Sequence, residues 1–149
     1  MPFIFLADAD ADDRFLLQEA LFQAGSPYDI REARDGEQAL RDLTRLKQEG
    51  ALPSLIVLDP HMPRKNGCHL LRALGSDELL SAVPVVVYTT VAGHLDPLYL
   101  VQKEAAFRDH LFIGKPSRAG DLEEVAGRML AACQIPVSLE GEALPAYSN

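Results

Sequence analysis

Four short apolar runs of the sequence are each followed directly by polar residues of the kinds that bind cations or act as nucleophiles. Asp8 and Asp10 follow the first run, Asp59 the second, Thr89 the third and Lys115 the fourth. A carboxylate held at the end of a buried strand is costly without a partner, so acids gathered around one lysine indicate a bound cation or deliberate ion pairing. If the runs are strands of one parallel sheet, these side chains converge on one end of it.

The elements that would position these residues alternate between apolar runs and helical patterns, which favours βα units around a parallel sheet. The stretch Tyr28–Ala33 is more polar and suits an edge of the sheet, whereas Leu55–Leu58 and Val85–Tyr88 are continuously apolar, as buried parallel strands are. The predicted strands are Phe3–Ala7, Tyr28–Ala33, Leu55–Leu58, Val85–Tyr88 and Leu111–Ile113.

Helical patterns follow the strands, and five right-handed βα units can wind helices onto both faces of an open sheet. We therefore expect a three-layer, doubly wound α/β fold, with a ligand site outside the carboxyl ends of the strands. One domain should cover residues 1–133, because the Pro-punctuated stretch 134–149 is too short for a second domain and reads as a tail. The predicted helices are Asp12–Ala24, Glu37–Gln48, Cys68–Leu74, a helix within Asp96–Phe107, and Asp121–Cys133.

The composition restricts the partners of the chain. Its 149 residues have a formal net charge of −8 and a pI near 4.9, and no dense basic patch, which opposes direct binding to nucleic acid. The apolar start is short and lacks a basic region, and no later run is long enough to span a membrane, so we expect a cytoplasmic protein. Cys68 and Cys133 lack metal-binding spacing and suit small buried side chains in a reducing compartment.

Three motifs resemble those of response-regulator receiver domains in two-component signalling. Leu55–Gly67, which contains Asp59, is similar to the signature around the phosphoacceptor aspartate of that family. Val85–Thr90 is similar to the fourth strand with its switch hydroxyl, and Ile113–Pro116 is similar to the fifth strand with its Lys-Pro pair. The resemblance extends over residues 2 to about 133 and implies a flavodoxin-like sheet with the strand order 2-1-3-4-5.

The resemblance implies that Asp59 is the phosphoacceptor and forms a covalent aspartyl phosphate. Lys115 would pair with the phosphoryl group, Thr89 would move to hydrogen-bond it, and the aromatic ring of Phe112 would change its burial in step. The family also implies a cis peptide bond between Lys115 and Pro116. Such a protein is not an enzyme in the usual sense, since it does no more than phosphorylate and dephosphorylate itself.

The partners that the resemblance implies are proteins. A sensor histidine kinase or a phosphotransfer protein would donate the phosphoryl group, and a downstream protein target would receive the signal by direct contact. The pattern from Asp12 to Leu21 resembles small stand-alone regulators of phytochrome-like sensor kinases. Receivers of this kind can form homodimers, so a dimer is one possible state of the chain.

The resemblance also implies a magnesium site, because phosphoryl transfer depends on positioning and charge compensation. Asp8, the side chain of Asp59 and the backbone carbonyl of His61 would bind the ion. The chain departs from the family at Ala9, where receivers carry a second acid, since a methyl group cannot coordinate magnesium. Asp10 could substitute if the loop shifts, and magnesium binding is otherwise expected to be weak.

Ala9 supports a second hypothesis, a pseudo-receiver that uses the same fold as a binding module with impaired magnesium-dependent phosphorylation. Asp59, Thr89 and Lys115 argue against it, because a site released from phosphoryl chemistry has no reason to keep all three polar groups together.

A third and remote hypothesis is a phosphohydrolase of the haloacid dehalogenase type. Phe5–Asp10 reads as an apolar strand followed by Asp-x-Asp, and Thr89 and Lys115 could serve as the second and third motifs of that family. Ala11 replaces the usual glycine or threonine, and Asp59 is left without a role, so the sequence favours the receiver.

Overall fold

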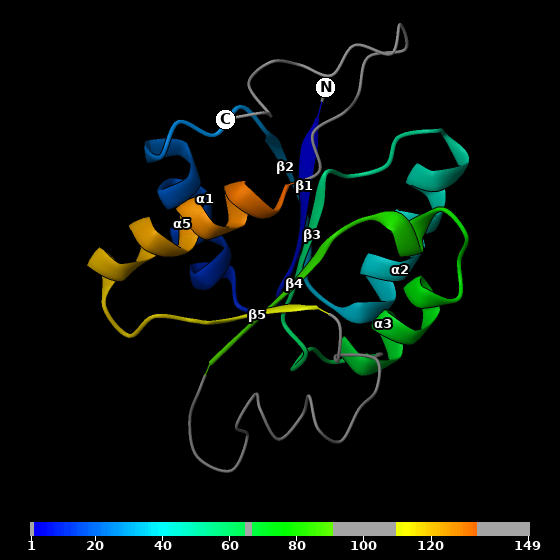
Figure 1. Ribbon diagram of the computed structural model, residues 1–149. Coiled ribbons are helices and arrows are strands. Elements are labelled where there is room, and N and C mark those ends of the chain that lie inside the picture. Colours follow the sequence, from blue (N-terminus) through cyan, green and yellow to red (C-terminus); the bar gives the residue numbers. More distant parts are fainter. Residues whose placement is uncertain (1, 65–66, 91–109, 134–149) are drawn as a thin grey trace, which may run out of the picture.

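The computed structural model describes residues 2–64, 67–90 and 110–133 of the chain (Figure 1). A five-stranded parallel sheet with the order β2-β1-β3-β4-β5 lies at its centre, which confirms the predicted fold and strand order. The strands run over β1 (Phe3–Ala7), β2 (Asp29–Ala33), β3 (Leu55–Leu58), β4 (Val85–Thr89) and β5 (Leu111–Gly114).

Helices cover both faces of the sheet, with α1 and α5 on one face and α2 and α3 on the other (Figure 1). They begin and end within two residues of the predicted limits, and the helix expected within Asp96–Phe107 lies outside the described residues. The helices are α1 (Ala11–Gln23), α2 (Gly36–Gln48), α3 (Gly67–Gly75) and α5 (Leu122–Ala132), with short 3-10 turns η1 (Leu80–Ala82) and η3 (Ala119–Asp121).

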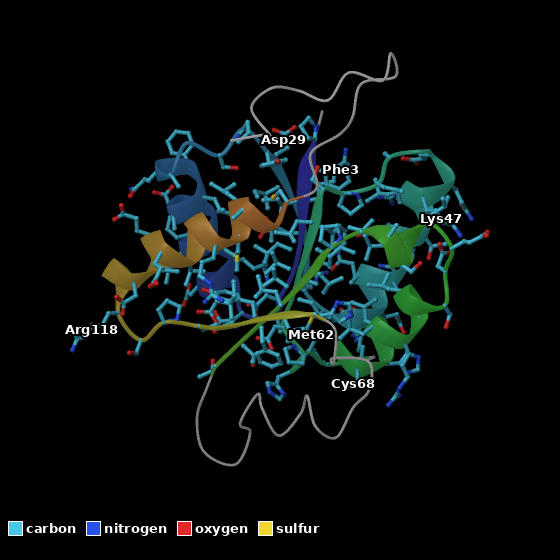
Figure 2. The ribbon with its side chains drawn as sticks, in the orientation of Figure 1. Phe3, Asp29, Lys47, Met62, Cys68 and Arg118 are labelled. Atoms are coloured by element: carbon cyan, nitrogen blue, oxygen red, sulfur yellow. The ribbon has the colours of Figure 1, made fainter. Side chains whose placement is uncertain are left out.

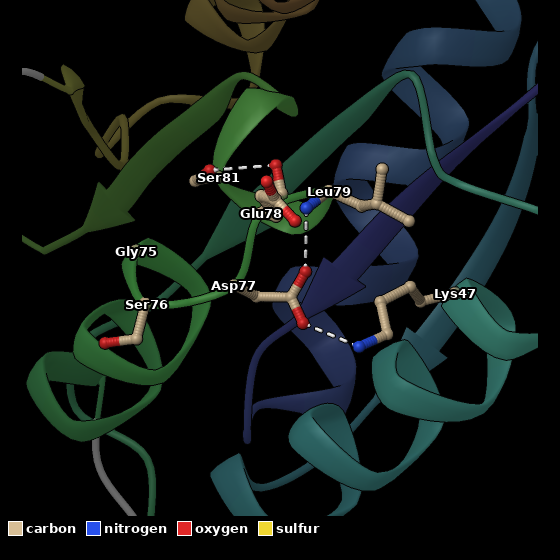
Figure 3. Close-up of a pocket in the computed structure, with 7 residues that line it drawn as sticks. All are labelled: Lys47, Gly75, Ser76, Asp77, Glu78, Leu79 and Ser81. Carbon is tan, nitrogen blue, oxygen red and sulfur yellow. Dashed lines mark hydrogen bonds and ion pairs between the residues drawn. The ribbon is translucent and has the colours of Figure 1, made fainter.

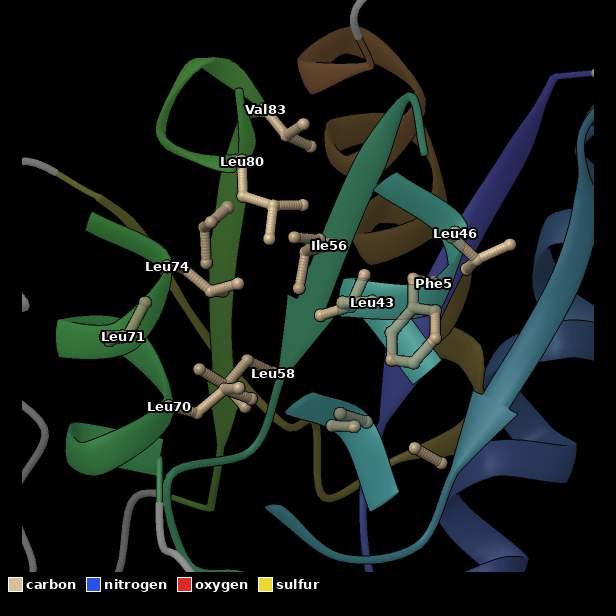
Figure 4. Packing of buried hydrophobic residues seen from close by; sticks show 14 of the residues in the cluster. Phe5, Leu43, Leu46, Ile56, Leu58, Leu70, Leu71, Leu74, Leu80 and Val83 are labelled. Carbon is tan, nitrogen blue, oxygen red and sulfur yellow. The ribbon is translucent and has the colours of Figure 1, made fainter. Parts of the chain in front are cut away.

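Two hydrophobic cores form because each strand presents alternate residues to opposite faces of the sheet. In β3, Ile56 and Leu58 pack toward α2 and α3, whereas Leu55 and Val57 pack toward α1 and α5. Figure 4 shows the first of these cores, where Phe5 of β1 lies beside helix α2. Side chains fill the space between sheet and helices on both faces (Figure 2). The face of the sheet from which a side chain emerges thus determines which pair of helices it can contact, and this also holds for the residues just after each strand.

Strand β2 forms one edge of the sheet, as its polar sequence predicts. Only Ala33 is buried in this strand, and it pairs in register with Ala7 at the end of β1. The backbone N–H of Asp8 continues this ladder by donating to the carbonyl of Ala33 at 3.0 Å. The ends of β1 and β2 therefore lie side by side at the carboxyl rim of the sheet.

One predicted backbone feature is wrong. The bond between Lys115 and Pro116 is trans, since no peptide bond among the described residues is cis. The trans form of a bond to proline is favoured by about 0.5–1 kcal/mol without other constraints. The N–H of Lys115 donates to the carbonyl of Thr89 at 2.7 Å, so the β4–β5 ladder reaches Lys115 with the trans bond in place.

None of the helices in the described segments combines the length and apolar character that crossing a membrane requires.

Candidate functional site

The polar site lies at the carboxyl rim of the sheet, on the side that faces α1 and α5. Leu6, Val57 and Ile113 all pack toward these helices. Because side chains alternate with period two, the residues two positions further on, Asp8, Asp59 and Lys115, emerge on the same side. The sheet thus brings together three of the residues that the sequence analysis singled out.

Lys115 lies at the centre of this site, with three carboxylates around its ammonium group. Its Nζ atom is 2.7 Å from Asp59 Oδ2, 2.8 Å from Asp8 Oδ2 and 2.7 Å from Asp13 Oδ2. An ammonium group has three N–H donors, so each one can be directed at a different carboxylate. With all four groups ionised the cluster retains negative charge, which favours a further cation.

Burial and pairing act in opposite directions on the charges of this cluster. Burial raises the pKa of Asp8, which is only 2 % exposed, although the hydrogen bond from Lys115 partly offsets this effect. Burial alone would lower the pKa of Lys115, but its hydrogen bonds to Asp13, Asp59 and Asp8 together raise it above the ordinary value. Lys115 is therefore a permanent cation at neutral pH.

The ring of Tyr88 lies below the ammonium group and belongs to the same face of the sheet. Lys115 Nζ is 5.7 Å from the ring centroid, a distance at which the π-face attracts a cation. Burial raises the pKa of the Tyr88 hydroxyl to about 12, so this side chain is neutral. Tyr88 thus contributes a buried, uncharged aromatic ring next to the ammonium group of Lys115.

The phosphoacceptor candidate Asp59 is fixed by its own backbone and by the loop that follows β3. Its N–H donates to the carbonyl of Ala7 at 2.9 Å, and its Oδ1 accepts the backbone N–H of His61 at 2.9 Å. Gly67 packs so closely on Pro60 that an added Cβ would lie 2.3 Å from the Pro60 Cα, so only glycine fits there. The imidazole of His61 is exposed, and this residue contacts the site through its backbone N–H.

Thr89 and Phe112 lie on the other face of the sheet, toward α2 and α3. Thr89 is fully buried, and its Oγ1 has no hydrogen-bond partner among the described residues. Phe112 is half-buried and packs against the core under α2 and α3. The register pairs Val87 with Phe112 and Thr89 with Gly114, so the two predicted switch residues are near neighbours.

Asp10 serves as the N-cap of α1. Its Oδ1 accepts the N–H groups of Asp12 and Asp13 at 2.9 and 3.1 Å, and its own N–H donates to Asp8 Oδ1 at 2.9 Å. The side chain is exposed, one of its oxygens is committed to the helix terminus, and among the described residues it has no ion pair with Lys115, so its role as a metal ligand stays a prediction. Asp10 positions the first turn of α1.

Asp13 is the site residue that sequence reasoning missed. Acids in the first turn of a helix are common because they complement its dipole, and this reason alone would account for Asp12 and Asp13. The side chain of Asp13 nevertheless reaches Lys115 across 102 positions of sequence. No local pattern signals such a contact, since it depends on the packing of α1 beside the end of β5.

The described residues contain no group of three or more His, Cys, Asp or Glu side chains arranged to hold a metal ion. Asp8 and Asp59 still offer two buried carboxylates on one side of the rim. Mg²⁺ commonly binds one or two protein carboxylates and keeps several waters as its other ligands. The carboxylates of Asp8 and Asp59 therefore fit this ion, although an acid at position 9 would add one more protein oxygen.

A hollow of about 700 Å³ lies beside the C-terminal ends of α2 and α3, away from the carboxyl rim (Figure 3). Asp77 Oδ1 accepts the N–H groups of Leu79 and Leu80 at 2.9 Å, and Asp77 Oδ2 pairs with Lys47 at 2.7 Å. These hydrogen bonds, that of Leu80 above all, lower the pKa of Asp77. The contacts join two helix ends and require no ligand.

Comparison with known proteins identifies similar chains. A family model described as "Response regulator receiver domain" matches residues 4–126. The probable methanogenesis regulatory protein FilR2 of Methanothrix harundinacea is 37 % identical over 92 residues, which cover 60 % of this chain and 59 % of that protein. Response regulator Rcp1 of Synechocystis is 34 % identical over 92 residues, which cover 58 % of this chain and 60 % of Rcp1. The matches therefore span about three-fifths of these relatives.

Solved structures show the same similarity. The phosphorylated cyanobacterial phytochrome response regulator RcpA has a TM-score of 0.74 and 26 % identity, covering 91 % of this chain and 98 % of RcpA. The Mn²⁺-bound form of Rcp1 has a TM-score of 0.68 and covers 97 % of both chains, but its 23 % identity supports the fold alone.

Proposed function

We propose that this chain, which belongs to the response regulator receiver domain family, accepts a phosphoryl group on Asp59 and transmits the signal by protein contact. The observation that carries the proposal is the 2.7 Å ion pair between Lys115 Nζ and Asp59 Oδ2 at the carboxyl rim. A buried carboxylate beside a buried cation has the two charges that acceptance of a phosphoryl group requires.

In the proposed reaction, an oxygen of Asp59 forms a bond to phosphorus while the bond from phosphorus to the donor breaks. With a phosphohistidine donor, the imidazole nitrogen is the leaving group and takes the bonding electrons. The hydrogen bond from the His61 N–H orients the Asp59 carboxylate, and Lys115 balances the charge of the phosphoryl oxygens. The permanent positive charge of Lys115 suits this role.

Asp8, the side chain of Asp59 and the backbone carbonyl of His61 would hold Mg²⁺ in this site. The ion supplies positive charge that neutralises phosphoryl oxygens. The carboxylate of Asp8, which is 2 % exposed and lies beside Asp59 in the same Lys115 cluster, supports this assignment. Because Ala9 offers no oxygen, we expect Mg²⁺ to bind more weakly than it would with an acid there.

Thr89 and Phe112 form the proposed switch. The unpartnered Oγ1 of Thr89 is a buried donor that gains a partner if a phosphoryl oxygen arrives at Asp59. A shift of Thr89 changes the space beside Phe112, because the two lie on one face of neighbouring strands. The signal would thus leave the site through β5.

The proposed partners are a sensor histidine kinase or a phosphotransfer protein as donor, and a downstream protein as target. The likeness to RcpA, which is covered over 98 % of its length, supports a receiver domain over residues 1–133, and we propose 134–149 as a tail. The net charge of −8 argues against a nucleic acid target. We propose no further enzymatic activity, and cytoplasmic location and homodimer formation stay predictions.

A pseudo-receiver is the second candidate, and Ala9 is the observation that favours it. Its fold and partners would be those of a receiver, but phosphorylation would be weak or absent because one metal-binding acid is missing. The two candidates differ in one measurable property, which is magnesium-dependent phosphorylation of Asp59.

The test is incubation of the full chain with acetyl phosphate, with and without Mg²⁺, followed by intact mass measurement. We expect one added phosphoryl group on the wild type in the presence of Mg²⁺ and none on Asp59→Asn. Asp77→Asn is the matched control, since this carboxylate lies away from the rim, and it should be phosphorylated like the wild type. No adduct under any condition would contradict the proposal and support the pseudo-receiver.

A further inference from the structure

A second pocket lies next to the site and is lined by three arginines. Its volume is about 370 Å³, and its wall includes Ala9 together with Arg34, Arg41 and Arg64. None of these three guanidinium groups has an ion pair or hydrogen bond within residues 2–64, 67–90 and 110–133. All three arginines are exposed, and together they give this hollow a local excess of positive charge in a chain whose net charge is −8.

Three different elements supply the arginines. Arg34 follows β2 directly, Arg41 lies in α2, and Arg64 lies in the loop after β3. This loop is fixed to the start of α2, since Gly36 and Glu37 donate their N–H groups to the carbonyls of Pro63 and Arg64 at 3.3 and 3.1 Å. The pocket therefore has a defined backbone frame.

Arg64 has a φ of +48°, the left-handed conformation that costs a non-glycine residue about 1–2 kcal/mol. Its carbonyl accepts the N–H of Glu37, so this conformation joins the loop to the first turn of α2. A backbone held in an unfavourable conformation beside a polar pocket is typical of functional sites.

The acids of the pocket do not neutralise the arginines. Asp35 Oδ1 accepts the backbone N–H of Gln38 at 2.7 Å and caps α2, and Glu37 is exposed in the first turn of that helix. Neither carboxylate has an ion pair with a described residue. Three arginines against two acids leave the wall of the pocket with a positive excess.

Ala9 connects this pocket to the site of Asp59. The backbone N–H of Asp8 bonds to the carbonyl of Ala33, so Ala9 and Arg34 follow neighbouring strands at the same rim. An acid at position 9 would place a carboxylate in the wall of the arginine pocket, where it could pair with the guanidinium groups. The alanine therefore leaves the pocket open to an external anion.

From this arrangement we infer that the arginine pocket binds a phosphate-class oxyanion, separately from the phosphoryl group accepted by Asp59. Guanidinium groups present planar pairs of N–H donors that match phosphate oxygens, and several of them together favour a dianion over a monovalent carboxylate. The anion could be inorganic phosphate or a small phosphodonor, which present the same oxygens to the pocket.

The experiment uses the full chain with Asp59→Asn, so that its outcome is independent of phosphoryl transfer. Inorganic phosphate, acetyl phosphate and acetate are titrated separately at constant ionic strength, and backbone amide shifts are followed by NMR. We expect saturable shifts at Ala9, Gly36 and Arg64 with both phosphate compounds and much weaker binding of acetate. If the shifts saturate with acetyl phosphate but not with inorganic phosphate, the pocket binds the small phosphodonor and not free phosphate.

Arg41→Gln is the test variant, and Arg45→Gln is its matched control. Arg45 lies one turn further along α2, pairs with Asp42 and Glu49, and does not line the pocket. Loss of one charged hydrogen-bonding group should weaken phosphate binding about tenfold in Arg41→Gln and leave it unchanged in Arg45→Gln. Arg34→Gln provides a second test if Arg41→Gln does not fold.

Three outcomes would overturn the inference. They are shifts that do not saturate, binding of acetate as tight as that of phosphate, and equal affinities in Arg41→Gln and Arg45→Gln.

Discussion

Asp13 and Lys115 are 102 positions apart in sequence, yet Asp13 Oδ2 lies 2.7 Å from Lys115 Nζ. This ion pair joins the first turn of α1 to the end of β5. It adds a third carboxylate to a lysine that Asp8 and Asp59 already contact. The chain thus lacks an acid at position 9, but the acid at position 13 contacts Lys115 together with Asp8 and Asp59.

Asp13→Asn should lower the pKa of Lys115 toward its ordinary value, because one of the three carboxylates that raise it is lost. The carboxylate of Asp13 is one-third exposed, so the free energy of unfolding should fall by no more than about 1 kcal/mol. NMR titration of the lysine side chain and urea denaturation measure the two effects. Asp12→Asn is the control, since Asp12 has no ion pair with Lys115. An unchanged pKa in Asp13→Asn would contradict the role assigned to this residue.

Ala9→Asp should strengthen magnesium binding about tenfold, because it adds a hard oxygen ligand beside Asp8 and Asp59. Calorimetric titration of the unphosphorylated chain with Mg²⁺ measures this directly. Ala11→Asp introduces the same charge at the start of α1 and separates a ligand effect from a general gain of negative charge. Equal affinities in the two variants would mean that position 9 does not face the ion.

The pKa of Asp8, raised by burial, makes a specific prediction for stability as a function of pH. A raised carboxyl pKa favours the folded state at low pH, and this contribution is lost as the pH rises from the unfolded value near 3.8 through the folded value. Asp8→Asn should therefore gain stability relative to the wild type as the pH rises through this window.

Asp77→Asn is a control of opposite sign for that experiment. The pKa of Asp77 is lowered, so its contribution is present above the unfolded value and is lost as the pH falls through the folded value. Asp77→Asn should then lose stability relative to the wild type as the pH rises. Chemical denaturation at a series of pH values tests both variants, and parallel stability curves for the two would exclude opposite pKa shifts at Asp8 and Asp77.

Thr89→Val should leave the unphosphorylated protein as stable as the wild type, or up to about 1 kcal/mol more stable. The reason is that the buried Oγ1 has no hydrogen bond in the described structure, and valine keeps the β-branched shape. The same variant should lose the shift of Phe112 NMR signals that beryllofluoride, a phosphoryl analogue, produces in the wild type. Thr90→Val, at an exposed position, is the control. A loss of more than about 2 kcal/mol would show that Thr89 is already bonded before phosphorylation.

The sequence predicts the sheet and the meeting of Asp8, Asp59 and Lys115, because apolar runs of period two determine which ends of parallel strands converge. It does not predict the positions of Asp10 and Asp13. Both fit the ordinary preference for acids at a helix start, and only the packing of α1 shows that one caps the helix and the other contacts Lys115.

The arginine pocket was equally out of reach of sequence reasoning. Arg34, Arg41 and Arg64 form no basic run, and the fold alone brings them together through contacts between the β3–α3 loop and the start of α2. The trans bond before Pro116 corrects an expectation that came from the family resemblance and from no residue of this chain.

The central claim is that Asp59, and no other carboxylate of the cluster, receives the phosphoryl group. Borohydride reduces an acyl phosphate to an alcohol, so it converts a phosphorylated aspartate to homoserine that peptide mass spectrometry can locate. After treatment with acetyl phosphate and Mg²⁺, we predict homoserine at position 59 and unmodified Asp8 and Asp13. Homoserine at position 8, where a haloacid dehalogenase would carry its nucleophile, or at position 13, would contradict the account.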